Sequence, residues 1–172
     1  EKERHFPKTK MALFGWLPFV AISVSCVISG WLSDRMIARG GSPTRVRKTF
    51  AGIGLTGATF LVPVVMGKDP NLAMALLTLA CLFFGIYTSN LWAITQTLAG
   101  PAAAGKWTSF QNGFGNLAGV VAPLLTGFVV DRTGQFHVAF LVAAGFALAG
   151  AGMYVLGVGP IRRVQFRGCR PL

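Results

Sequence analysis

The chain has 172 residues, of which 53% are hydrophobic and only 12% are charged, and its mean hydropathy is +0.59. This balance is typical of membrane proteins and excludes most classes of soluble domain. A net charge of +11 would fit nucleic-acid binding in a soluble protein. Here, however, the lysines and arginines all lie between or beyond long apolar segments, so we expect no nucleic-acid partner.

Five segments without Lys, Arg, Asp or Glu follow one another along the chain. They cover residues 11–33, 49–67, 70–104, 107–130 and 133–161. A helix rises about 1.5 Å per residue, so about 20 residues cross a hydrocarbon layer of about 30 Å. The segments therefore predict an all-α membrane protein that lies in a lipid bilayer. We expect its five transmembrane helices at about residues 10–33, 48–66, 71–98, 105–130 and 136–161.

Basic residues are distributed unequally between the two sides of the predicted bundle. One side carries Arg35, Arg39, Arg45, Arg47, Lys48, Lys106, Arg162, Arg163, Arg167 and Arg170. The loops on the other side carry Lys68 and Arg132. Because cytoplasmic loops are enriched in Lys and Arg, we expect a multi-pass protein of the bacterial inner membrane with a cytoplasmic C-terminus. Four basic residues near the N-terminus depart from this distribution, because they lie on the side with few other basic residues. This is consistent with a further helix before residue 1.

The third predicted helix carries polar side chains along one face. Gly85, Ser89, Trp92 and Gln96 follow one another at spacings of four, three and four, which places them together on a helix. Hydroxyl, amide and indole groups inside a bilayer are costly unless they find a partner or water. These groups either bond to a neighbouring helix or face a substrate. Their alignment favours a substrate-facing surface.

The fourth predicted helix combines small residues with amides. The small residues and the proline recur every four positions, as Gly115, Gly119, Pro123 and Gly127. Such a stripe permits close helix packing, and Pro123 frees a carbonyl and bends the helix. Asn112 and Asn116 lie one turn apart near the stripe. This pattern is typical of a moving wall around a polar path, with rigid packing as the alternative.

A short motif follows the first predicted helix. It begins at Gly30, continues through Asp34 and Arg35, and is followed by Arg39 and further basic residues. Gly30 lets a neighbouring helix approach, and Asp34 at the membrane edge can pair with a cation or a helix N-terminus. Anchoring by positive charge explains the basic residues but not Gly30 and Asp34 together.

This motif resembles the repeated loop motif of the major facilitator superfamily. The segment Gln96-Thr97-Leu98-Ala99-Gly100-Pro101 and the run from Gln111 to Gly134 are similar to the anion:cation symporter family, with its galactonate, glucarate, hexuronate and phthalate carriers. The resemblance covers almost the whole chain. It implies helices eight to twelve of twelve, which are five helices of the C-terminal six-helix bundle. We therefore expect a fragment whose N-terminal bundle is absent.

The resemblance also implies a function and a set of site residues. In galactonate-type carriers, a Ser and a Trp three residues apart on helix ten and an Asn on helix eleven contact the substrate. Ser89, Trp92 and Asn112 match these positions, and Gln96, Gln111 and Asn116 are further candidates. The implied function is cation-coupled symport of organic anions such as sugar acids, with H⁺ or Na⁺ as the coupling ion. The residues that carry the coupling ion would belong to the absent half, and we expect no metal and no cofactor.

The sequence also bears on two other classes of function. A membrane enzyme needs a nucleophile–base pair or a metal cluster, but His5 and His137 are isolated in the sequence, so no catalytic site is expected. A stand-alone five-helix subunit or a small channel without transport activity of its own remains as an alternative. The coding sequence before residue 1 distinguishes it from a transporter fragment.

Overall fold

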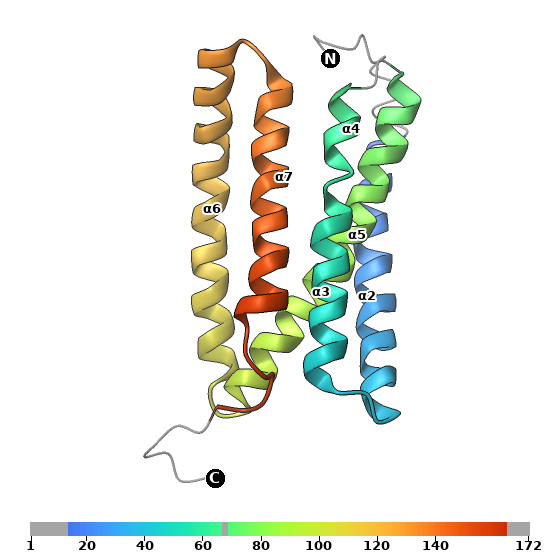
Figure 1. Ribbon diagram of the computed structural model, residues 1–172, viewed down its shortest axis with the longest axis vertical. Helices are drawn as coiled ribbons and strands as arrows, with labels where there is room; N and C mark the ends of the chain where they lie inside the picture. The colour runs from blue at the N-terminus through green and yellow to red at the C-terminus, as the bar shows by residue number, and fades with distance from the viewer. Residues whose placement is uncertain (1–13, 67–68, 165–172) are drawn as a thin grey trace.

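The computed structural model describes residues 14–66 and 69–164, and within them the fold is helical throughout, without strands (Figure 1). The elements are α2 (Leu17–Ala38), α3 (Pro43–Ala58), α4 (Leu61–Met66), α5 (Pro70–Ala99), α6 (Ala104–Thr133), α7 (Phe136–Gly152) and a π-helical turn η1 (Met153–Gly157). Four helices of this described part are long and apolar enough to cross a membrane: α2, α5, α6 and the segment His137–Gly157. The all-α membrane fold is therefore confirmed. Residues 10–13, where the first helix was expected to begin, lie outside the described residues.

The second expected helix, 48–66, is divided into α3 and α4. Pro63 explains the division, because proline has no N–H and its ring clashes with the carbonyl four residues earlier, here that of Thr59. The chain tightens at this point, and the Val62 N–H donates to the Thr59 carbonyl at 2.9 Å. In Figure 1 the two helices follow one another alongside α5. The second of the five expected crossings thus consists of two consecutive helices, α3 and α4, instead of one.

Two other helix ends and the course of α6 differ from expectation. Helix α2 runs on to Ala38, so Asp34 and Arg35 lie in its last turns rather than in a loop, and the chain turns only at Gly40, whose φ is +96°. The last helix was expected to reach residue 161. It ends in η1, because Pro160 disfavours helical backbone in the residue before it. Helix α6 is continuous through Pro123, so the expected bend does not interrupt it.

Helix α5 packs closely between α2 and α3. On the α2 side, Ser25, Ser29 and Ser33 are buried, and a Cβ at Gly85 would overlap the Ser25 hydroxyl and lie 2.5 Å from the Ile22 carbonyl oxygen. On the α3 side, a Cβ at Gly54 would lie 2.5 Å from the Tyr87 backbone nitrogen. The backbones approach this closely because the contact positions have small side chains or none.

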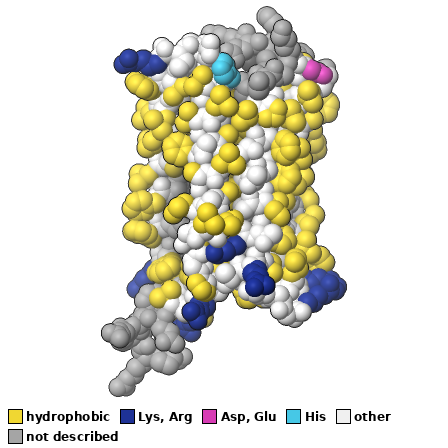
Figure 2. Space-filling view, in the orientation of Figure 1, with side chains coloured by type: hydrophobic (Ala, Val, Ile, Leu, Met, Phe, Trp, Pro, Cys, Tyr) yellow, Lys and Arg dark blue, Asp and Glu magenta, His cyan; other side chains and the backbone are white. Residues whose placement is uncertain are grey.

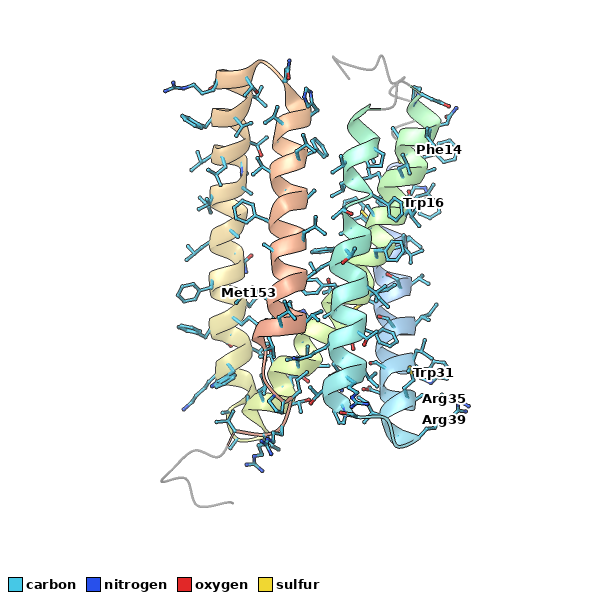
Figure 3. The ribbon with its side chains drawn as sticks, in the orientation of Figure 1. Phe14, Trp16, Trp31, Arg35, Arg39 and Met153 are labelled. Carbon is cyan, nitrogen blue, oxygen red and sulfur yellow. The ribbon has the colours of Figure 1, made fainter. Side chains whose placement is uncertain are left out.

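The described Lys and Arg residues gather at one end of the bundle (Figure 2). This basic end holds the α2–α3 and α5–α6 connections and the segment after η1, whereas Arg132 lies at the opposite end with Asp69 and His137. The basic residues Lys68, Arg167 and Arg170 lie outside the described residues. Figure 3 places Arg35 and Arg39 at the basic end of α2. The arrangement matches the unequal charge distribution between the two sides of the sequence-predicted bundle.

The segment after η1, residues 159–164, crosses the helix ends at the basic end. The Ile161 side chain is buried and its N–H donates to Thr44 Oγ1 at 2.9 Å. The Val164 N–H donates to the Leu98 carbonyl at 2.9 Å, which satisfies one of the last carbonyls of α5. Gly100 has a φ of +68° and lies against the Arg163 side chain. This C-terminal segment therefore bonds to both α3 and α5.

Gly85→Ala tests the close contact between α2 and α5. The added methyl group would overlap Ser25 and the α2 backbone, and overpacking of this kind costs about 1–3 kcal/mol. We expect a lower midpoint of thermal unfolding for the purified full-length protein in detergent. Gly152→Ala is the matched control, because a Cβ there has no neighbour within 4 Å among the described residues. Equal midpoints for the two variants would contradict the packing described here.

Candidate functional site

A buried polar cluster lies where α5 meets α2. The Ser29 and Ser89 hydroxyl oxygens are 2.7 Å apart, and the position of a Cβ on Gly30 is 3.7 Å from the Ser89 Cβ. Ser89 is half-buried and also lies within 3.3 Å of the Ile86 carbonyl. In this conformation Ser89 thus takes part in bonding between helices, and a Cβ on Gly30 would meet Ser89 only at an ordinary van der Waals distance.

Asn90 belongs to the same cluster and was missed in the sequence. It is fully buried, and its Nδ2 donates to the Ile86 carbonyl at 3.1 Å and to Ser89 Oγ at 3.3 Å. Its Oδ1 has no partner among the described residues. The signal was an amide beside Ser89 in the middle of an apolar run, where a buried polar group needs a partner.

A second polar contact joins α5 to α6. Thr95 is buried and its hydroxyl donates to Gln111 Oε1. Thr95 Oγ1 also lies 3.1 Å from the Leu91 carbonyl oxygen. Gln111 was a predicted site residue, whereas Thr95 was not recognised. Trp92 is half-buried and Gln96 is exposed. Both lie on α5 between the Ser89 cluster and the basic end.

The two asparagines of α6, Asn112 and Asn116, are exposed in the described structure. Asn116 Nδ2 donates to the Asn112 carbonyl at 2.8 Å, within the same helix, and both side chains are exposed. The structure does not bring Asn112 into contact with Ser89 or Trp92. It does place them at similar heights, because Ser89 lies about 15 Å before the end of α5 and Asn112 about 12 Å after the start of α6.

The small-residue stripe of α6 faces open space. Cβ atoms placed on Gly115, Gly119 and Gly127 meet no atom within 4 Å among the described residues, and no described residue of α6 is buried. Pro123 lies in the same exposed stripe. The expected packing of this stripe therefore has no partner within residues 14–66 and 69–164.

The residues of the loop motif make two separate contacts. Arg47 of α3 donates to Asp34 Oδ1 at 3.0 Å, with 12% of the Arg47 side chain and 68% of the Asp34 side chain exposed. Arg35 packs against Trp31 of the same helix, with its guanidinium 5.0 Å from the centre of the Trp31 ring (Figure 3). Arg39 is exposed at the end of α2. The motif therefore ties α2 to α3 through Asp34.

The unequal burial of Arg47 and Asp34 leads to an unequal cost of removing either partner. Asp34→Ala leaves a mostly buried guanidinium without its counter-ion, whereas Arg47→Met keeps the packed stem and leaves an exposed carboxylate. We expect Asp34→Ala to lower the free energy of unfolding by about 1–2 kcal/mol more than Arg47→Met, a cost reduced by the exposure of Asp34. Denaturation in graded SDS measures the difference, and a more harmful Arg47→Met would contradict this explanation.

Comparison with known proteins gives these helices a family. Residues 2–168 match the Major Facilitator Superfamily. The chain is 32% identical over 153 residues to the probable sulfoacetate transporter SauU of Cupriavidus necator, covering 88% of this chain and 35% of that protein. It is 32% identical over 164 residues to the D-galactonate transporter of Escherichia coli, covering 95% of this chain and 37% of that protein.

A third relative is the hexuronate transporter of Bacillus subtilis, 29% identical over 167 residues, covering 92% of this chain and 38% of that protein. The chain thus spans a little over a third of the length of these relatives. The resemblance to organic-anion carriers that the motifs suggested is confirmed. Since the family match includes nearly every residue, this multi-pass membrane chain belongs to the Major Facilitator Superfamily.

Proposed function

We propose that the chain is the C-terminal part of a secondary active transporter for small organic anions such as sugar acids. Its relatives are named as transporters of sulfoacetate, D-galactonate and hexuronate, all of which are small organic anions. The observation that carries the proposal is the placement of polar side chains on α5 and α6 at similar heights within helices that are otherwise apolar. A polar path through a membrane needs such a lining.

Asn112 is the strongest candidate for contact with the substrate. Its side chain is exposed on a helix with no buried described residue, so its amide is available to a hydroxyl or carboxylate. Trp92 would add an apolar face and an N–H donor, with Gln96 and Asn116 as further donors on α5 and α6. Ser89 reaches a substrate only by exchanging its bond to Ser29, so we rank it after Asn112.

Alternating access would rock this bundle against the remainder of the transporter. The open stripe of Gly115, Gly119, Pro123 and Gly127 would pack on segments outside this chain. The Asp34–Arg47 pair, with Arg35 and Arg39 beside it, would limit the motion at the basic end. Because cytoplasmic loops are enriched in basic residues, we place this end and the C-terminus in the cytoplasm, with the protein in the inner membrane of a bacterium.

The coupling ion would be H⁺ or Na⁺, bound mainly outside this chain. The described acidic residues are Asp34, Asp69 and Asp131, and each lies near the end of a helix. Carboxylates that carry protons in transporters lie inside the membrane, facing a cavity or a partner. We therefore assign the coupling groups to the segments that precede these helices.

Uptake into proteoliposomes containing the full-length protein tests the proposal. We expect Asn112→Ala to lower kcat/KM by about tenfold or more, because a hydrogen bond to a charged group contributes about 1.5–3 kcal/mol. Labelled sulfoacetate, D-galactonate and a hexuronate serve as substrates, with and without proton and sodium gradients. Asn71→Ala, which removes an amide at the other end of α5, should leave uptake unchanged.

Two results would count against the proposal. Undiminished uptake by Asn112→Ala would remove this residue from the site. Uptake that reaches equilibrium but never exceeds it, whatever the gradient, would indicate a channel or facilitator instead of a coupled transporter.

A further inference from the structure

A long apolar groove runs along the outer side of the bundle between α3 and α7. It has a volume of about 870 Å³ and is lined by Ile53, Thr56 and Phe60 on one side and by Leu148, Gly152 and Leu156 on the other. The exposed fractions of Ile53, Leu148 and Leu156 are 51%, 50% and 86%. Figure 2 shows hydrophobic side chains along this face, with Lys and Arg side chains below them. The groove therefore presents apolar surface that something in the membrane must cover.

The length of the groove matches one leaflet of a bilayer. Its α3 side runs from Lys48 to Phe60, which corresponds to about 18 Å along a helix. Half of a hydrocarbon core of about 30 Å is about 15 Å. One end of the groove lies at the basic end of the bundle, since Lys48 itself lines it. An acyl chain of the leaflet at that end has the length and the polarity to fill the groove.

One basic residue lines this end of the groove, and two others lie near it in the fold. Lys48 Nζ donates to the Val155 carbonyl at 3.1 Å, which holds the ammonium group at the groove and leaves two further N–H donors. Arg45 is exposed one turn earlier on the same face of α3, because it precedes Thr49 by four residues. Arg162 is exposed in the C-terminal segment, next to Ile161, whose N–H bonds to Thr44.

We infer that the groove between α3 and α7 binds an anionic phospholipid, with an acyl chain along the groove and its phosphate beside Arg45, Lys48 and Arg162. Basic pockets between transmembrane helices are suited to anionic headgroups, and each basic residue near the surface contributes about 1 kcal/mol. A zwitterionic lipid would fill the same apolar groove but gain less from the three cations. The site is separate from the polar residues of α5 and α6 and does not depend on the proposed transport.

Native mass spectrometry of the full-length protein tests this site. The protein is titrated with phosphatidylglycerol and with phosphatidylcholine of identical acyl chains. We expect tighter binding of phosphatidylglycerol, and about a thirtyfold loss of that affinity in the double variant Arg45→Gln/Arg162→Gln, which removes two of these contributions. The matched control is Lys106→Gln/Arg132→Gln, which removes two exposed charges away from the groove and should retain the affinity.

A second variant tests the groove itself. Gly152→Phe places a ring in the groove, and its Cβ meets no described atom within 4 Å. We expect weaker phosphatidylglycerol binding although all three cations remain. Equal affinity for the two lipids would overturn the inference, and so would an equal loss of affinity in the control Lys106→Gln/Arg132→Gln. Unchanged phosphatidylglycerol binding in both Arg45→Gln/Arg162→Gln and Gly152→Phe would overturn it as well.

Discussion

The close approach of α5 to α2 and α3 is the constraint on which the rest of the bundle depends. Lipid tails are as apolar as the helices, so water expulsion does not hold these helices together and packing must do so. Gly54 and Gly85 leave no room for a side chain, and the buried serines of α2 fit against the same helix. The same contact brings the Ser29 and Ser89 hydroxyl groups together.

Helices α5 and α6 differ in how their polar groups are satisfied. On α5, Ser89, Asn90 and Thr95 all have partners, although Asn90 Oδ1 has none among the described residues. On α6, Gln111 accepts from Thr95, but Asn112 and Asn116 are exposed, and Cβ atoms on the glycines would meet nothing within the described part of the chain. Helix α5 is thus held by bonds to its neighbours, whereas most of the surface of α6 has no neighbour among the described residues.

The fold class could be predicted because an uncharged apolar run of this length is most stable as a membrane-spanning helix, which satisfies its own backbone hydrogen bonds. The break at Pro63 was missed because the run around it stays apolar, although the missing N–H alone could have indicated it. The polar face of α5 that contains Ser89 could be predicted from the spacing of its residues. The bond between Ser89 and Ser29 could not, because the spacing along one helix carries no information about which neighbouring helix that face contacts. Whether Asn112 meets a substrate is likewise decided by segments outside these helices.

The C-terminal segment has a mechanical consequence. It continues from α7 through η1, and it bonds to Thr44 at the start of α3 and to Leu98 at the end of α5. The C-terminal segment therefore connects α7 to α3 and α5 at the basic end of the bundle. A tilt of α7 would therefore strain these two hydrogen bonds, which couple the end of α7 to α3 and α5.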